Sequence, residues 1–247
     1  MKTRGMARIL VSAALLMLPT IAAAEVSVQL DDTGKVKRVF VLMPRRGGAQ
    51  AVWSQVRAHT PLEQILNPLG DILGDLAPQI RTDPVTGNPW AMWSMNVANQ
   101  KQVGYSFWTG TAWSVPRRIV TQPDPYYYDE INPSFALDLG GRPYAVWERA
   151  ESAHAVYLSL MFQGVWTPPL LVSDEGVDTR RPTIELQGSS VVITYETAAG
   201  AQRRTYDSIV LLGIATKLMD TPIPPGQDGK GGSGGSDDGG GGDKKRR

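Results

Sequence analysis

The residues best suited to binding a ligand lie in a proline-bounded stretch, residues 122–130, with the sequence QPDPYYYDE. Three tyrosines stand directly before two carboxylates: Tyr126, Tyr127, Tyr128, Asp129 and Glu130. A tyrosine in a loop offers a flat apolar face and a hydroxyl at low entropy cost, which suits sugar rings and protein surfaces. The competing interpretation is that at least one tyrosine packs beneath the loop, and alternation along the chain singles out Tyr127 for that role.

A second charged segment carries Asp178, Arg180 and Arg181. Both segments fall between successive units of a repeat described below. In a repeat of antiparallel strands such connections share one face, so we expect the two segments to lie near each other. Acidic, basic and aromatic groups would then form one ligand-binding surface, and polar loops on a rigid scaffold are where binding residues concentrate.

The sequence offers no convincing catalytic or metal-binding constellation. The only histidines are His59 and His154, and there is no cysteine, so neither a metal site nor a catalytic triad is indicated. A Gly-x-Ser-x-Gly match at residues 231–235 lies in a glycine-rich tail, without the strand and helix that a nucleophile elbow requires. No phosphate-binding glycine loop occurs. We expect no cofactor and no nucleic-acid ligand.

The candidate residues belong to a repeated unit of alternating strands. Residues 78–83, 133–138 and 182–186 each precede a Gly/Pro-type turn and an aromatic-rich strand. Those second strands contain Trp93, Trp147 and Tyr195, at spacings of 54 and 48 residues. A second hairpin follows in the first two of these units, which gives four antiparallel strands and the dimensions of a β-propeller blade.

The repeat predicts an all-β, propeller-like fold of about four blades of four antiparallel strands, with a partial first blade. In that blade we prefer to align Trp53 with Trp113 on a fourth strand, although alignment with Trp93 is also open. A long connection with a helical turn near residues 62–66 would follow. Residues 214–219 would form a weak fourth strand of the last unit, and residues 26–30 would pair with or near that unit, because unpaired edges invite aggregation.

The aromatic residues that recur in register are expected to hold the blades together. We interpret Trp93, Trp147 and Tyr195 as equivalent residues packed between blades, and Trp113 and Trp166 as anchors of turns. Repeats bury the faces that they share, so packing explains these positions better than sugar stacking does.

One turn resembles a known motif. Ser106-Phe-Trp-Thr-Gly-Thr-Ala-Trp113 has the spacing of the Asp-box, Ser-x-Asp-x-Gly-x-x-Trp, with Trp108 in place of the aspartate. Residues 159–166 form a second copy, in which Gly164 stands two residues before the tryptophan instead of three. The chain therefore resembles the degenerate Asp-box repeats of sialidase-like bacterial β-propellers. The resemblance speaks to the fold more than to an activity.

That resemblance would imply an arginine triad, a Tyr/Glu pair and a catalytic aspartate. Arginines are available, but the family's amino-terminal Arg-Ile-Pro motif is missing. Six blades of this size would need near 300 residues, whereas the folded part here has about 200.

The two ends of the chain differ from the repeat. Residues 1–24 have the basic, apolar and small-residue regions of a cleavable signal peptide, so we expect an exported protein, periplasmic or extracellular. Residues 226–247 are glycine-rich and predict a disordered tail after a domain at residues 25–225. Loss of residues 1–24 removes three basic and no acidic residues, so the formal charge falls from +1 to −2. No further transmembrane segment is expected.

These observations favour an exported, non-catalytic binding or interaction module of the cell envelope or exterior, with a glycan or a protein as ligand. The alternative is a sialidase-like glycoside hydrolase. Paired carboxylates roughly 5–10 Å apart on the loop-rich face would favour the hydrolase, and an open aromatic surface without them would favour the binding module. The sequence leaves the oligomeric state open.

Overall fold

The computed structural model describes residues 25–30, 35–44, 52–57, 62–66, 75–97, 100–119 and 128–220. Within these ranges the chain forms sixteen strands and one helix, α1 (Ser208–Asp220). The predicted signal peptide and the predicted tail lie outside the described residues.

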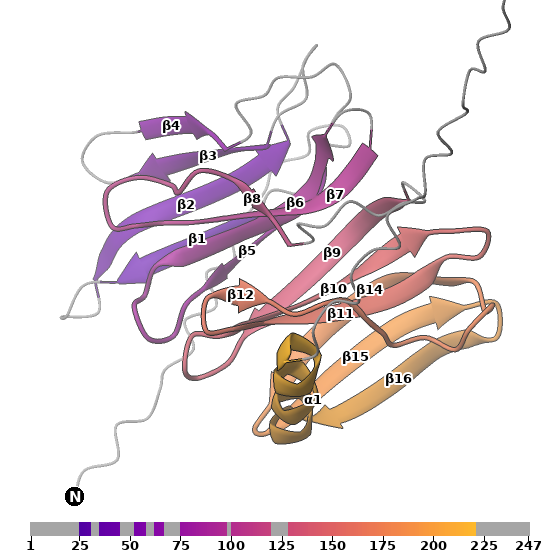
Figure 1. Cartoon of the computed structure of the whole chain (residues 1–247). Coiled ribbons are helices and arrows are strands. Elements are labelled where there is room, and N and C mark those ends of the chain that lie inside the picture. The colour runs from indigo at the N-terminus through magenta and orange to yellow at the C-terminus, as the bar shows by residue number, and fades with distance from the viewer. Residues whose placement is uncertain are drawn as a thin grey trace, which may run out of the picture.

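The strands form four antiparallel sheets in chain order (Figure 1). The first contains β1 (Glu25–Leu30), β2 (Val36–Pro44), β3 (Val52–Arg57) and β4 (Leu62–Ile65). The second contains β5 (Leu76–Thr82), β6 (Pro89–Val97), β7 (Gln100–Phe107) and β8 (Arg117–Arg118). In the third, β9 (Asp129–Leu137), β10 (Pro143–Ala150) and β11 (Ala155–Phe162) are joined by β12 (Val165–Trp166) and β13 (Leu170–Leu171), which both pair with β11. The fourth contains β14 (Thr179–Gln187), β15 (Ser190–Thr197) and β16 (Gly200–Asp207).

The first strand of each sheet is its inner strand. β1 contacts β5, β5 contacts β9, and β9 contacts β14, so the four sheets are arranged like consecutive blades. Side chains join the first two sheets: the Ser27 and Thr82 hydroxyls are 2.7 Å apart, and Gln29 Nε2 donates to Oδ1 of Asn88, in the turn that follows β5, at 3.2 Å. The predicted all-β, propeller-like fold of about four blades is confirmed.

Three inner strands carry the same irregularity. Ala77, Asn132 and Arg181 each precede a proline and have positive φ angles of 49°, 50° and 50°. At each of them the register with the second strand shifts, which marks a β-bulge. Proline cannot donate a ladder hydrogen bond, so an X-Pro pair in a strand is tolerated at a bulge. The bulge also removes the backbone N–H of the residue before the proline from the ladder, so that this N–H can bind another acceptor.

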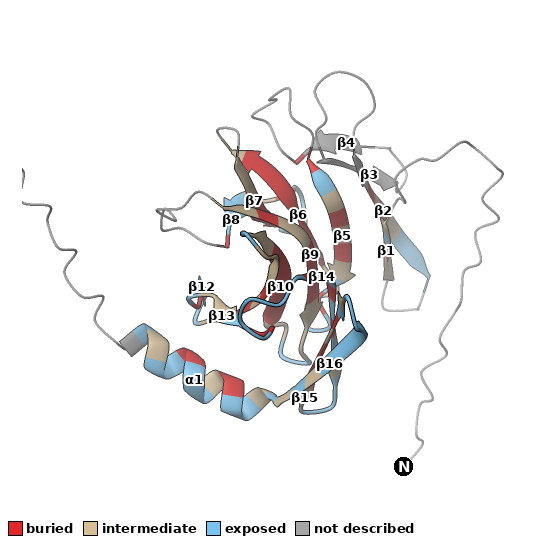
Figure 2. Cartoon of the chain, turned by 90° about the vertical axis from the view of Figure 1, so that its right-hand side faces the viewer, coloured by how far each residue is buried: buried red, intermediate tan, exposed pale blue. Residues whose placement is uncertain are grey.

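The aromatic residues predicted to pack between blades do so. Trp93 belongs to the apolar cluster between the first and second sheets, Trp147 to the cluster between the second and third, and Tyr195 to the cluster between the third and fourth. Each is no more than 2% exposed. Burying one such side chain contributes about 1.5–3 kcal/mol to the free energy of folding, so these residues stabilise the contacts between blades substantially. Figure 2 shows buried residues along the strands where the sheets face one another.

The two Asp-box-like turns are also built alike. Ser106 Oγ donates to the carbonyl of Ser114 at 2.8 Å, and Ser159 Oγ donates to the carbonyl of Thr167 at 2.8 Å. In each turn the tryptophan directly before that carbonyl is buried against the sheet before it, as predicted for Trp113 and Trp166.

Helix α1 replaces the strand predicted at residues 214–219. Asp207 caps it, because the backbone N–H of Ile209 donates to Asp207 Oδ1 at 2.7 Å. Leu211 and Ala215 lie four residues apart, share one side of the helix and are buried against the third and fourth sheets. The apolar residues that suggested a strand therefore follow a helical period, and the prediction of a strand there is wrong.

The amino-terminal sheet also differs from expectation. Residues 62–65 form strand β4 instead of a helical turn, and Trp53 lies on the third strand, where it pairs with Met43. The first sheet thus has four strands, and within the described residues the last sheet has three. Strand β1 pairs with β2 and contacts β5; no pairing with the carboxy-terminal sheet is seen in the described part of the chain.

Candidate functional site

The direction of the strands sorts the connections onto two faces. We call loop-bearing the face that carries residues 151–154, between the second and third strands of a sheet, and residues 172–178, between sheets. We call turn-bearing the opposite face, which carries the turns at residues 83–88, 138–142 and 188–189. The candidate site lies on the loop-bearing face, where the third and fourth sheets meet.

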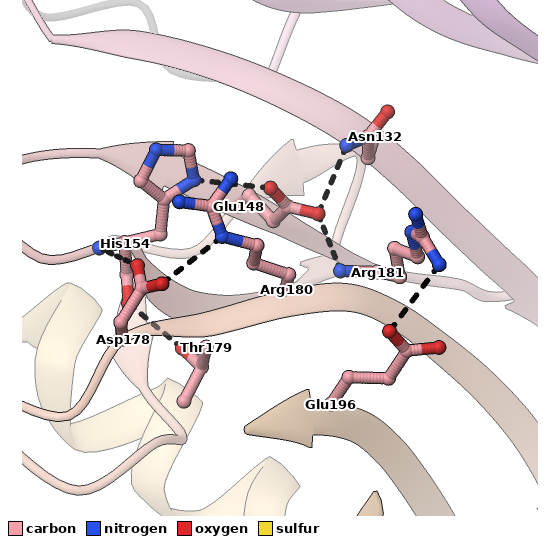
Figure 3. A network of polar contacts seen from close by, with 8 residues as sticks. All are labelled: Asn132, Glu148, His154, Asp178, Thr179, Arg180, Arg181 and Glu196. Carbon is pink, nitrogen blue, oxygen red and sulfur yellow. Dashed lines mark hydrogen bonds and ion pairs between the residues drawn. The ribbon is translucent and has the colours of Figure 1, made fainter. Parts of the chain in front are cut away.

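Glu148 is the centre of this site (Figure 3). It lies near the end of β10 and is 1% exposed. Its Oε1 accepts hydrogen bonds from Asn132 Nδ2 at 2.9 Å and from the backbone N–H of Arg181. The Arg181 N–H is available because the bulge in β14 removes it from the ladder. A buried carboxylate of one blade therefore satisfies the bulge of the next.

His154 connects Glu148 with a second carboxylate. Its Nδ1 lies 3.2 Å from Glu148 Oε2, and its backbone N–H donates to Asp178 Oδ1 at 2.9 Å. Its carbonyl accepts from the backbone N–H and the hydroxyl of Thr179, at 2.8 and 2.9 Å. The side chain is 20% exposed, and the far edge of the ring, which carries Nε2, points away from Glu148 (Figure 3). Glu148 thus holds the imidazole at Nδ1, and Nε2 remains on the edge of the ring that faces away from Glu148.

Asp178 is the accessible carboxylate of the pair. Its side chain is 51% exposed, and Oδ2 accepts from Arg180 Nε at 3.0 Å. The N–H of His154 and, after it, Arg180 lower the pKa of Asp178 below its ordinary value of 3.8. Asp178 is therefore ionised at neutral pH. It is an anion at the surface, next to a histidine whose ring contacts the buried carboxyl group of Glu148.

The side chain of Arg181 points away from His154 and Asp178 (Figure 3). The guanidinium lies 3.4 Å from Glu196, and the two side chains are 75% and 56% exposed. A surface pair of this kind contributes at most about 1 kcal/mol. Arg181 therefore serves the site through its backbone more than through its charge.

The other predicted residues that the structure describes, Tyr128, Asp129 and Glu130, lie on the side of the third sheet that faces the second sheet. Glu130 is 5% exposed and bonds Arg149 at 3.0 Å, and the Arg149 guanidinium lies 4.2 Å from the centre of the Tyr157 ring. Burial raises the pKa of Glu130, although Arg149 opposes that effect. Asp129 Oδ1 accepts from the N–H of Lys101 at 2.7 Å, and the carbonyl of Tyr128 accepts from Gln100 at 2.6 Å.

The structure thus divides the predicted surface. It brings together Asp178 and Arg180, directs the Arg181 side chain toward Glu196 and directs Glu130 toward the second sheet. Tyr126 and Tyr127 lie outside the described residues. The physical reason is strand alternation. Glu148 and Arg149 are consecutive, so one faces the fourth sheet with Arg181 and the other faces the second sheet with Glu130.

Sequence reasoning missed Glu148, Asn132 and His154. A signal for Glu148 was present: it directly follows Trp147, as Glu196 follows Tyr195, at the same position of the repeat. The equivalent residue of the second sheet is Ser94, whose buried Oγ has no hydrogen-bond partner in the described structure. His154 had no signal, because its importance comes from a residue six positions earlier and another twenty-four positions later.

A shallow pocket adjoins the site on the fourth sheet. Its volume is about 250 Å³, and Asp174, Thr179 and Tyr195 are among the residues that line it.

In the described ranges no three acidic or histidine side chains are grouped so as to hold a metal ion. No helix there is long and apolar enough to cross a membrane.

Comparisons with known proteins identify the fold. No protein-family model matches the sequence, and a search of curated proteins finds no match. Among solved structures, an α-L-arabinanase of Penicillium chrysogenum, in complex with arabinobiose, superposes with a TM-score of 0.55 at 12% identity, over 77% of this chain and 64% of that one. An endo-arabinase of Bacteroides thetaiotaomicron gives 0.44 at 12% identity, over 69% and 71%. The Aleuria aurantia lectin gives 0.48 at 10% identity, over 75% and 58%.

The chain has a β-propeller fold and spans 64% of the length of the Penicillium enzyme. Of these three structures, the one with a TM-score above 0.5 is a glycan-cleaving enzyme. The prediction of a non-catalytic binding module is therefore wrong as the main interpretation. The comparison fits the glycoside hydrolase alternative better, because this fold carries such activity in that protein.

Proposed function

We propose that the protein is an exported, sialidase-like propeller glycoside hydrolase that cleaves a glycan at the loop-bearing face. One observation carries the proposal: Asp178 accepts from the backbone N–H of His154, while Glu148 holds the ring of the same histidine. The Asp178 carboxylate and the His154 ring therefore lie within about 10 Å of each other. Glycoside hydrolases place their two reacting groups about 5–10 Å apart, on either side of the scissile bond, and here the two groups would be a carboxylate and an imidazole.

The roles follow from exposure. Asp178 is accessible, and it is ionised at neutral pH because its pKa is lowered, so its carboxylate is in the form that can accept a proton from a water attacking the anomeric carbon. Glu148 is too buried to touch a sugar and acts as a positioning residue that orients His154. The protonated imidazole donates its Nε2 proton to the leaving oxygen as the glycosidic bond breaks. One water is consumed, and the proton taken by Asp178 balances the proton given by His154.

The adjoining pocket is the proposed place for one sugar unit. Its volume of about 250 Å³ lies below the about 300 Å³ at which pockets for drug-sized ligands begin. The exposed Asp174 and Gln202 offer polar groups to a ligand there, and Thr179, which lines the pocket, directly follows Asp178 in the chain. Tyr126, Tyr127 and Tyr128 remain a proposed sugar-stacking surface, and residues 25–225 remain the proposed domain.

The test is hydrolysis by the purified protein of a panel that includes arabinan, arabino-oligosaccharides and sialylated oligosaccharides. Release of reducing sugar is expected from at least one of them. Asp178→Asn and His154→Gln should each lower kcat by at least about 100-fold, the size of a general acid or base contribution. Glu185→Gln, an exposed carboxylate elsewhere on β14, is the matched control and should keep full activity.

The pH dependence gives a second readout. Asp178 must be ionised to act as base, and its pKa lies below 3.8, so the acidic limb of the rate profile should fall below that pH. No hydrolysis of any substrate in the panel, or an Asp178→Asn variant as active as the native protein, would contradict the proposal.

A further inference from the structure

The pocket beside Asp178 is lined by one carboxylate and, among the lining residues that the structure describes, by no basic side chain. The carboxylate belongs to Asp174, which opens a turn in which its carbonyl accepts from the N–H of Val177 at 3.3 Å. The preceding residue ties this turn to the third sheet, because Ser173 Oγ accepts from the N–H of Val156, on β11, at 3.1 Å. Asp174 is therefore held at the edge of the pocket by the backbone on which it stands.

Arg204 holds the Asp174 side chain from the fourth sheet. Its Nη2 donates to Asp174 Oδ1 at 2.6 Å, and its Nε donates to the hydroxyl of Tyr195 at 3.2 Å. Tyr195 is 2% exposed, so the guanidinium is anchored on a buried side chain. Asp174 itself is 72% exposed, and the contact with Arg204 at Oδ1 leaves Oδ2 for a ligand.

The other lining residues suit a polyhydroxylated ligand with apolar carbon–hydrogen faces. Val177 is 41% exposed and Ala199 is exposed as well, so both offer aliphatic contacts. The exposed Gln202 offers an amide that can both donate and accept. A pocket that combines apolar contacts with a few polar groups is the usual form of a small-molecule site. A sugar ring can pack on the aliphatic side chains while its hydroxyls bond Asp174 and Gln202.

The charges around the pocket do not favour an anionic sugar. Recognition of a carboxylate or a phosphate commonly uses an arginine that forms two parallel hydrogen bonds with it. Three arginines near the pocket are each paired with a carboxylate already: Arg180 with Asp178, Arg181 with Glu196 and Arg204 with Asp174, at 3.0, 3.4 and 2.6 Å. Glu175 adds a fourth exposed carboxylate, so the negative charges exceed the positive ones by one. An anionic sugar would meet Asp174 and would have to displace one of these pairs.

We propose that Asp174 determines the specificity of the pocket, because it accepts hydrogen bonds from the hydroxyls of a neutral sugar and repels sugars that carry a carboxylate. Arg204 is the positioning residue that holds it. Sialylated glycans and glycans that contain uronic acids are then the excluded class. The inference rests on the proposed function in one respect, namely that a sugar occupies this pocket.

The experiment compares neutral and anionic members of matched oligosaccharide pairs by isothermal titration calorimetry. Arabinotriose and galactotriose are each paired with a derivative whose terminal primary hydroxyl is oxidised to a carboxylate, and lactose is paired with sialyllactose. In at least one pair the neutral member should bind at least about tenfold more tightly, as expected for like charges near a protein surface. Added salt should reduce this ratio, because it screens exposed charges.

Asp174→Asn should lower the same ratio by about tenfold, because the amide still bonds hydroxyls but no longer repels a carboxylate. Glu175→Gln, at the neighbouring exposed carboxylate outside the pocket lining, is the matched control and should keep the native ratio. Arg204→Gln leaves Asp174 charged but unheld, so it should weaken binding of the neutral members by about tenfold and still exclude the anionic ones. Thermal unfolding will show that each variant is folded.

Three results would overturn the inference: equal or tighter binding of the anionic members, a ratio that neither Asp174→Asn nor salt changes, and absence of binding to every probe. Preference for neutral members without hydrolysis of any of them would support the inference and contradict the proposed function. Hydrolysis of the anionic members in preference to the neutral ones would support the proposed hydrolase and overturn the inference.

Discussion

Replacing Glu148 by alanine removes the acceptor that joins the third and fourth sheets. The lost carboxylate leaves three donors without a partner: Asn132 Nδ2, the Arg181 N–H and His154 Nδ1. A buried donor left unpaired costs about 1–3 kcal/mol. The Arg181 N–H belongs to a bulged backbone and cannot turn toward water, so it should cost the most. The Asn132 and His154 side chains can rotate and regain part of their loss.

We therefore expect Glu148→Ala to lower the free energy of unfolding by about 3 kcal/mol. In a domain of this size, 1 kcal/mol corresponds to about 2–4 °C, so the melting temperature should fall by about 10 °C. Glu148→Gln keeps an acceptor at Oε1 and should lose about half as much. Urea unfolding followed by tryptophan fluorescence measures both values, because Trp147 adjoins the site in the chain.

Ser94→Ala is the matched control, since Ser94 occupies the equivalent position of the second sheet. Its Oγ is buried without a hydrogen-bond partner in the described structure, so its removal should change stability by less than about 0.5 kcal/mol. The reasoning is refuted if Glu148→Ala costs less than about 1 kcal/mol, or if Ser94→Ala costs as much as Glu148→Ala.

Three further predictions concern stability. Gly141→Ala should destabilise the protein more than Gly110→Ala in thermal unfolding: both need a positive φ, worth about 1–2 kcal/mol, but only the Gly141 Cβ would meet Asp83, at 2.7 Å. Since the folded pKa of Glu130 is raised, the stability that this group contributes is present below pH 4.5 and lost as the pH rises through the raised pKa. The free energy of unfolding of Glu130→Gln, measured by urea titration, should therefore rise relative to that of the native protein as the pH increases from 4 to 8. A difference between the two proteins that does not change with pH would contradict this. Ser159→Ala should cost about 1–2 kcal/mol in chemical unfolding through the lost Asp-box-like bond, and an unchanged midpoint would show that the bond is dispensable.

Much of the fold could be predicted from local pattern. A period of two, Gly- and Asp-containing turns and recurring aromatic residues mark strands and hairpins wherever they occur, because these signals act between near neighbours. Trp93, Trp147 and Tyr195 were identified in this way, and each occupies its own interface between blades. Local pattern misled where strand and helix share apolar residues, as in α1, whose buried Leu211 and Ala215 follow the helical period. It also misled in the first sheet, where residues 62–65 form β4 instead of a helical turn and Trp53 lies on the third strand.

The candidate site was decided by tertiary structure. Glu148 and Arg181 are 33 residues apart, and their contact requires a bulge that frees one N–H, together with the packing of one sheet on the next. Strand alternation then sends Glu130 to the opposite side of the sheet, although the sequence places it in the same charged set. The sequence alone therefore determined which residues form strands and repeats. Only the register and stacking of those strands decided which charges meet, because a shift of one residue reverses the face that a side chain occupies.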